Sequence, residues 1–200
     1  VITASVTVVP PTPVTATAAV TSNYNGQQIS CNGLSDGRIA VTAAGGVGGY
    51  TYVLNQIPAN VSGATTGIFT GLPAGTYTVT VRDANTCDVT TSPITITQPG
   101  VLGATAAVTS NYNGQQISCN GASDGKITIT VSGGTGPFIY TSVEVPGNVT
   151  GASSGIFTGL PAGNYTFNVR DVNTCATSTA QVTISQPNLM VATLAVSKHY

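Results

Sequence analysis

The feature that most constrains this chain is an internal repeat. Residues 14–101 and 102–189 align without a gap, and about 54 of the 88 aligned positions are identical. Self-similarity at a fixed period is the signature of tandem structural units. The sequence therefore predicts two domains of one design, repeat 1 at 14–101 and repeat 2 at 102–189.

The segments outside the two blocks continue the pattern. Residues 6–11, VTVVPP, fall where repeat 1 closes with ITITQP, and residues 192–200, ATLAVSKHY, fall where repeat 2 opens with ATAAVTSNY. We expect 1–13 to hold the terminal strand of a preceding repeat-like unit and 190–200 the first strand of a following one. Two organisations stay open: a window on a longer array, or a subunit whose end strands await partners.

The segment 72–83, LPAGTYTVTVRD, indicates the local structure most clearly. Pro and Gly place a tight turn before Tyr77, after which Val79 and Val81 alternate with threonines, as in a strand with one buried face. A tyrosine just after a Leu-x-x-Gly turn is typical of the tyrosine corner of immunoglobulin-like sandwiches. We therefore interpret Tyr77 and its equivalent Tyr165 as buried structural anchors.

The remaining sequence of each repeat predicts short strands between Gly-, Asn- and Asp-rich turns, with no helical period. In repeat 1 we expect strands at 15–22, 28–31, 38–44, 50–54, 67–72, 77–82 and 88–97. This pattern favours an all-β fold of tandem immunoglobulin-like antiparallel β-sandwich domains.

The charge of the chain excludes several classes of partner. Charged residues make up 6% of the sequence, with five Lys and Arg and a net charge of -1. Binding to nucleic acid or anionic lipid requires clustered basic residues, which are missing here. No apolar run is long enough for a transmembrane segment.

The four cysteines fall two per repeat, with no close CxxC pair of the kind that binds zinc. An even number per small β domain favours one disulfide in each, and we predict the bonds Cys31–Cys87 and Cys119–Cys175. A bond that closes a loop of about 57 residues would stabilise a domain by about 4 kcal/mol. Free buried thiols, or bonds between neighbouring domains, are the alternatives that the spacing leaves open.

Two sets of side chains are weaker candidates for binding sites. Asp83 with Asn85, and Asp171 with Asn173, could offer oxygens to calcium, but capping of the turn by these side chains is the preferred interpretation. We therefore expect no metal and no cofactor.

Glycosylation sequons occur at Asn60, Asn148 and Asn164, and chance occurrence is the preferred explanation in a chain so rich in Thr and Asn. The single histidine, His199, has no nucleophile beside it, so no catalytic site is expected.

The order CNG, SDG, a Gly-rich turn before an aromatic strand, LPAGTYTVTVRDANTC and a closing ITITQP resembles the SprB-type repeat of large secreted Bacteroidota surface proteins. The resemblance covers 31–99 and 119–187. It implies an extracellular immunoglobulin-like module used in tandem in adhesins and filaments, and no catalytic residues.

Two functions follow from these observations. The first is a non-enzymatic structural repeat of an extracellular filament or cell-surface adhesin stalk, in contact head-to-tail with neighbouring copies or repeats. The second is an adhesive module that binds a glycan or protein through residues 47–59 and 135–147, where the two repeats differ most.

Overall fold

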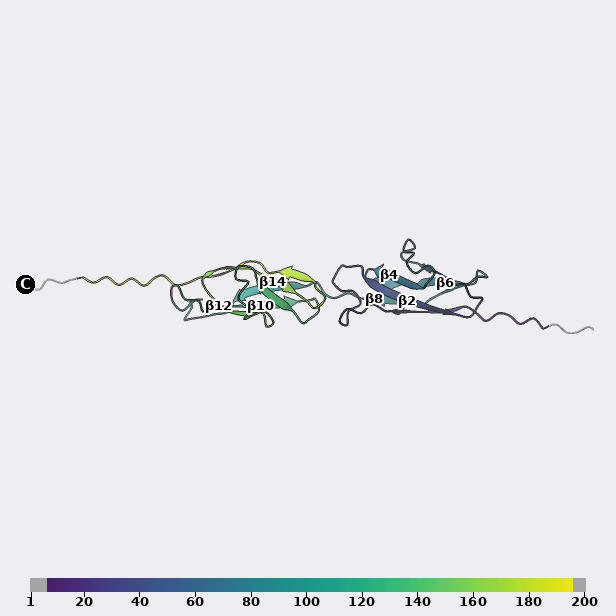
Figure 1. The fold of residues 1–200 in the computed structure, drawn as a ribbon, viewed down its shortest axis with the longest axis horizontal. Coiled ribbons are helices and arrows are strands. Elements are labelled where there is room, and N and C mark those ends of the chain that lie inside the picture. The colour runs from purple at the N-terminus through teal and green to yellow at the C-terminus, as the bar shows by residue number, and fades with distance from the viewer. Residues whose placement is uncertain (1–6, 196–200) are drawn as a thin grey trace, which may run out of the picture. The chain divides into compact units, whose positions relative to one another are not determined.

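The computed structural model describes residues 7–195 and divides the chain into two compact units, Val1–Pro99 and Gly100–Tyr200. Within residues 7–195, each unit contains eight short strands (Figure 1). The strands of unit 1 are β1 (Thr15–Val20), β2 (Gly37–Ala44), β3 (Thr51–Leu54), β4 (Ile68–Leu72), β5 (Gly75–Tyr77), β6 (Val79–Arg82), β7 (Asp88–Thr90) and β8 (Ile94–Ile96). The strands of unit 2 are β9 (Gly103–Val108), β10 (Gly125–Ser132), β11 (Ile139–Ser142), β12 (Ile156–Leu160), β13 (Gly163–Tyr165), β14 (Phe167–Arg170), β15 (Ala176–Ser178) and β16 (Val182–Ile184).

The sheets of unit 1 are antiparallel and have the orders β1-β2-β4, β3-β6-β7 and β5-β8. Unit 2 repeats this topology with the orders β9-β10-β12, β11-β14-β15 and β13-β16. The predicted all-β, immunoglobulin-like sandwich is therefore confirmed for both units. None of the described residues lies in a helix long and apolar enough to cross a lipid bilayer.

The core of each unit follows from the alternation of apolar and polar residues along its strands. Ile39 and Val41 of β2 are buried, as are Val79 and Val81 of β6, while the residues between them are exposed or half-buried. Phe69 of β4 belongs to the same core and has no exposed surface. Unit 2 has an equivalent core, built from Ile117, Ile127, Ile129, Tyr140, Phe157, Leu160, Tyr165, Phe167, Val169 and Ile184.

Three predicted strands differ in the structure. The strand predicted at 77–82 is interrupted at Thr78, so that Tyr77 ends β5 and Val79 begins β6, and the two strands belong to different sheets. The closing strand predicted at 88–97 is divided into β7, which pairs with β6, and β8, which pairs with β5. Pro93 lies between them and has no N–H to donate to either sheet. Residues 28–31 form no strand, because the side-chain oxygen of Gln28 accepts the N–H of Thr97 at 2.7 Å.

The segments that flank the two units were predicted to contain strands of neighbouring repeats. The described parts, residues 7–13 and 190–195, form no strand, and the other residues of these predictions lie outside the described part. Large apolar side chains are exposed here, including Val8 at 87%, Met190 at 93% and Leu194 at 101%.

Candidate functional site: the two ends of each repeat

The leading end of unit 1, where the chain enters β1, is formed by residues 12–14, 45–47 and 83–87. The N–H of Gly46 donates to the carbonyl of Thr12 at 2.8 Å, and the N–H of Val47 donates to Asp83 Oδ2 at 2.9 Å. These bonds hold the incoming chain against the Gly-rich turn and that turn against the loop after β6.

Asp83 is the polar centre of this leading end and is only 4% exposed. Its Oδ1 accepts the backbone N–H groups of Asn85 at 2.9 Å and Cys87 at 2.8 Å. The bonds from Val47 and Cys87 lower the pKa of the Asp83 carboxyl, because they stabilise its charged form. The carboxylate therefore acts as a cap on the turn, the interpretation that the sequence favoured over calcium binding.

The Gly-rich turn is a requirement of this packing. Gly45 has a φ of +76°, and a Cβ at this position would lie 2.0 Å from the carbonyl oxygen of Pro13. A Cβ on Gly46 would lie 2.5 Å from Asp83 Oδ2. Only glycine lets the incoming chain approach this closely.

Unit 2 reproduces the leading end with equivalent residues. The N–H of Gly134 donates to Gly100 O at 3.0 Å, and the N–H of Thr135 donates to Asp171 Oδ2 at 2.9 Å. Asp171 Oδ1 accepts the N–H of Cys175 at 2.9 Å. The same device therefore receives the chain in both repeats.

The trailing end, where the chain leaves β8, is held by the CNG segment. Asn32 Nδ2 donates to Pro99 O at 2.9 Å, and the N–H of Gly33 donates to Gln98 Oε1 at 2.8 Å. In unit 2 the bonds from Asn120 to Pro187 and from Gly121 to Gln186 measure 3.0 and 2.9 Å. This role was not predicted from the sequence, although the matching CNG and QP segments of the two repeats were a signal for it.

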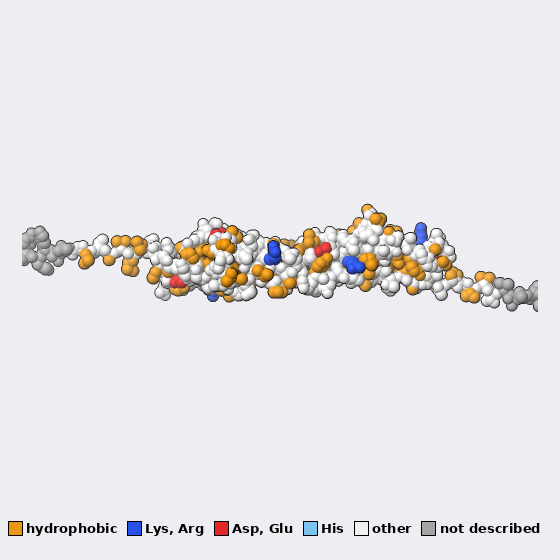
Figure 2. All heavy atoms as spheres, viewed as in Figure 1, with side chains coloured by type: hydrophobic (Ala, Val, Ile, Leu, Met, Phe, Trp, Pro, Cys, Tyr) orange, Lys and Arg blue, Asp and Glu red, His pale blue; other side chains and the backbone are white. Residues whose placement is uncertain are grey.

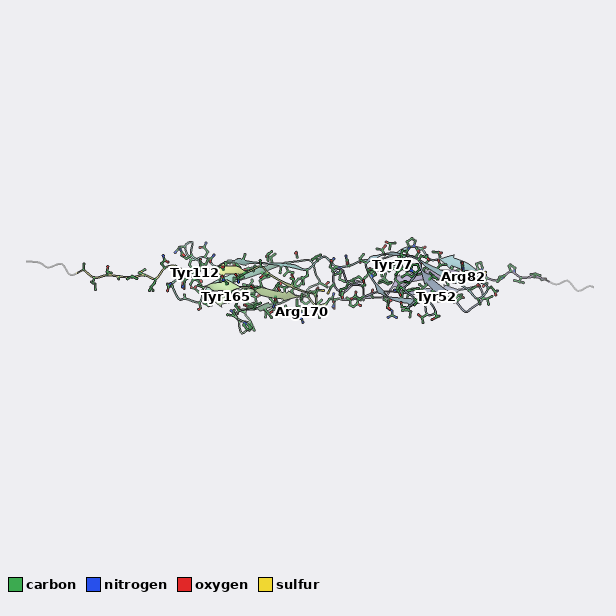
Figure 3. The ribbon with its side chains drawn as sticks, turned by 90° about the horizontal axis from the view of Figure 1, so that it is seen from above. Tyr52, Tyr77, Arg82, Tyr112, Tyr165 and Arg170 are labelled. Atoms are coloured by element: carbon green, nitrogen blue, oxygen red, sulfur yellow. The ribbon has the colours of Figure 1, made fainter. Side chains whose placement is uncertain are left out.

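The tyrosines of the LPAG turns lie in the core of their own units (Figure 3). Tyr77 and Tyr165 are each 3% exposed, and their hydroxyls donate to Pro73 O and Pro161 O, both at 2.7 Å. Burial raises the pKa of both phenols. This is the geometry of a tyrosine corner, with the ring in the core and the hydroxyl on the turn.

The cysteines do not pair as the sequence analysis predicted. Cys87 and Cys119 are free and exposed, whereas Cys31 and Cys175 are disulfide-bonded. The predicted bonds Cys31–Cys87 and Cys119–Cys175 are therefore not formed.

The topology gives the physical reason for this correction. Cys31 lies at the trailing end of unit 1, beside Asn32, and Cys87 lies at the leading end, on the loop capped by Asp83. These ends are separated by the length of β2, roughly 23 Å at about 3.3 Å per residue. A disulfide requires Cα atoms about 4.4–6.8 Å apart.

The sequons take part in the turn before the fourth strand of each unit. Asn60 Nδ2 donates to Thr70 O at 2.9 Å, and Asn148 Nδ2 donates to Thr158 O at 2.8 Å. Their Oδ1 atoms accept bonds from Ser62 and Thr150. The equivalence of these two asparagines thus has a structural explanation. Asn164, on β13, accepts a bond from Thr183.

The segments 47–59 and 135–147 contribute β3 and β11 to the outer face of a three-stranded sheet. On this face of unit 1, Arg82 forms an ion pair with Asp88, with N–O distances of 2.7 and 2.8 Å. Unit 2 has Ala176 in place of that aspartate, and its Arg170 lies opposite Ile139, which is 59% exposed (Figure 3). A groove of about 520 Å³ runs over these residues of unit 2.

Other chemistry is sparse on the described residues. Within 7–195 no group of three or more His, Cys, Asp or Glu residues could hold a metal ion. On the face drawn in Figure 2, the charged side chains are isolated among uncharged ones. His199 lies outside the described part of the chain.

The profile of the SprB repeat matches residues 23–59 and 111–141, equivalent parts of the two units. The suspected resemblance to the SprB repeat is therefore confirmed. This match supports an extracellular structural or adhesin-like repeat. No match was found among curated proteins.

Several solved structures are similar at low identity. A C-terminal fragment of intimin in complex with the translocated intimin receptor has a TM-score of 0.34 and 19% identity over 90% of this chain and 65% of that one. Domains 4–9 of the surface layer protein SbsC have a TM-score of 0.33 and 20% identity, over 88% of this chain and 31% of that one. Fibronectin(III)-like modules of Clostridium thermocellum CbhA have a TM-score of 0.30 and 15% identity, over 90% of this chain and all of that one. The chain thus spans less than two thirds of the first two.

Proposed function

We propose that the chain is a non-enzymatic structural segment of an extracellular filament or cell-surface adhesin stalk, built from tandem immunoglobulin-like repeats. The observation that carries the proposal is the repetition of both ends. Gly46 and Gly134 bind the incoming chain, and Asn32 and Asn120 bind the outgoing chain, at closely similar distances. A repeat that fixes both of its connections suits an array that transmits tension along its length.

The flanking segments support head-to-tail contact between neighbouring repeats. Val8 and Val9 are 87% and 77% exposed, and Met190 and Leu194 are more exposed still. Apolar segments that leave their backbone unpaired are rarely left uncovered in β proteins. Addition of such a segment to the sheet edge of a neighbour is a known mode of recognition, and its repetition without closure builds a filament.

Sedimentation of the purified chain at increasing concentration tests this contact. We expect concentration-dependent polymers, and we expect deletion of residues 1–11 to abolish them, because this segment matches the closing strand of a repeat. Val61→Ser, at an apolar side chain of unit 1 that is 71% exposed, is the matched control and should leave polymerisation intact. Polymers that form equally well without residues 1–11 would contradict head-to-tail strand addition.

A second candidate function, binding of a glycan or protein, is favoured by one observation. Arg170 lies in the groove over β11, β14 and β15 without the aspartate partner that its equivalent Arg82 has. A ligand carboxylate could take the place of that partner. In a glycan and protein binding screen, Arg170→Gln should weaken any binding through this face, whereas Arg38→Gln, on the other sheet, should leave it unchanged.

A further inference from the structure

We propose that Cys87 and Cys119 are junction cysteines, each of which forms a disulfide with a cysteine of a neighbouring repeat of the same kind. The bond joins a trailing-end cysteine of one repeat to a leading-end cysteine of the next. This inference rests on the tandem array proposed above and adds a covalent link at each junction.

The positions of the cysteines divide them into two classes. Cys31 and Cys119 lie at trailing ends, beside the Asn that binds the outgoing chain. Cys87 and Cys175 lie at leading ends, where their N–H groups donate to the Asp that caps the turn. Each repeat therefore carries one cysteine of each class, at opposite ends of its sandwich.

The oxidation states supply a second, independent observation. One cysteine of each class, Cys31 at a trailing end and Cys175 at a leading end, is disulfide-bonded. The 88-residue equivalents of these two, Cys119 and Cys87, are free and exposed. Cysteines of both classes can therefore form a disulfide. Within one repeat, roughly 23 Å of strand separates the two cysteines, which is too far for a bond between them.

The partner of each free thiol follows from its class. Cys87 lies at the end that receives residues 12–14, and it requires a trailing-end cysteine like Cys31. Cys119 lies at the end that binds Pro187, and it requires a leading-end cysteine like Cys175. A second copy of this chain, or an adjoining repeat of a longer one, offers both.

The reaction is a thiol–disulfide exchange with an oxidant disulfide, such as oxidised glutathione or the disulfide of an oxidase. The S–H bonds of the two cysteines and the S–S bond of the oxidant are broken, and one new S–S bond is formed. Two electrons and two protons pass to the oxidant, which leaves as two thiols.

Two single variants test the class rule. Cys87→Ser retains only the free trailing-end thiol, and Cys119→Ser retains only the free leading-end thiol. With oxidised glutathione, the unmodified chain should give a ladder of reducible oligomers on a non-reducing denaturing gel. Each variant alone should stay monomeric, and a one-to-one mixture should give one reducible dimer.

If either variant alone forms disulfide-linked dimers in the same yield as the mixture, the exposed thiols oxidise without specificity. This result would overturn the pairing of trailing-end with leading-end cysteines. The absence of a dimer from the mixture would also overturn it. Electron microscopy of the double variant Cys87→Ser, Cys119→Ser separates this failure from failure of the array, since filaments without the bond would leave the proposed function standing.

Alkylation of protein from its native source, denatured without reduction, distinguishes the two sources of the partner. If Cys87 and Cys119 resist alkylation in material that runs at the mass of a single chain, the partner is an adjoining repeat of that chain. If they resist alkylation only in covalent oligomers, the partner is a second copy. Alkylation of Cys87 and Cys119 in that material would contradict the proposal.

Discussion

At the scale of single residues, the tyrosine corners connect each core to its LPAG turn. Tyr77 places its ring among the residues of the core and uses its hydroxyl to bind a carbonyl four residues upstream. The local sequence predicts this geometry, because the turn and the alternating strand fix the direction of the ring. The hydroxyl matters because Pro73 O otherwise loses its partner.

Replacing Tyr77 tests the two parts of this role separately. Tyr77→Phe should destabilise unit 1 by about 1–3 kcal/mol, the cost of a buried polar group left without its partner. Tyr77→Ala should cost about 3–5 kcal/mol and unfold the unit. Chemical denaturation followed by tyrosine fluorescence measures both.

Tyr112 is the matched control, because it is 39% exposed while its hydroxyl also donates to a backbone carbonyl, that of Asp124. Tyr112→Phe should change the free energy of unfolding by less than about 1 kcal/mol. An equal loss from Tyr77→Phe and Tyr112→Phe would contradict the buried anchor.

Asp83 predicts a pH dependence of the stability of unit 1. The pKa of the Asp83 carboxyl is lower in the folded state than in the unfolded chain. Its contribution to the stability of unit 1 is therefore complete at pH values above the unfolded pKa of about 3.9. The stabilisation should be lost as the pH falls from about 4 through the folded pKa. Thermal unfolding between pH 7 and 2 measures this loss, and Asp83→Asn should reduce the pH dependence. A pH profile that is the same with and without Asp83 would contradict the cap.

At the scale of elements, the Gly-rich turns decide how the chain enters each sandwich. Gly45→Ala places a Cβ against Pro13 O at a positive φ, so it combines backbone strain with a clash. Gly26→Ala is the control, because Gly26 has a φ of +89° but nothing within 4 Å of the added Cβ.

We expect Gly26→Ala to destabilise unit 1 by about 1–2 kcal/mol and Gly45→Ala to cost more. Differential scanning calorimetry on the two variants gives the comparison. Similar melting temperatures for both would show that the incoming chain does not pack on this turn.

The sequence predicted elements where a local pattern decides the structure. Alternation along 79–82 and the Asn-Gly turn at 25–26 determine strand and turn directly. The sequence could not predict that Gln28 would bind Thr97 through its side chain, because that contact spans 69 residues. The pairing of Cys31 and Cys87 failed for the same reason: their distance depends on topology, which spacing along the chain does not reveal.

At the scale of the whole molecule, each repeat must be stable without a disulfide of its own. Reduction should therefore leave the melting temperature of each unit nearly unchanged, whereas loss of a bond within a small domain typically costs about 2–5 kcal/mol. Calorimetry with and without dithiothreitol checks this. A large decrease on reduction would indicate that a bond within a repeat stabilises it.

In the proposed array the repeats are alike at both ends, and few charges oppose their packing. Electron microscopy of the native material tests this most directly. We predict filaments or stalks whose density repeats along the axis with a period of one or two immunoglobulin-like domains. Separate, compact particles of two domains, with the flanking segments folded back onto them, would contradict the account.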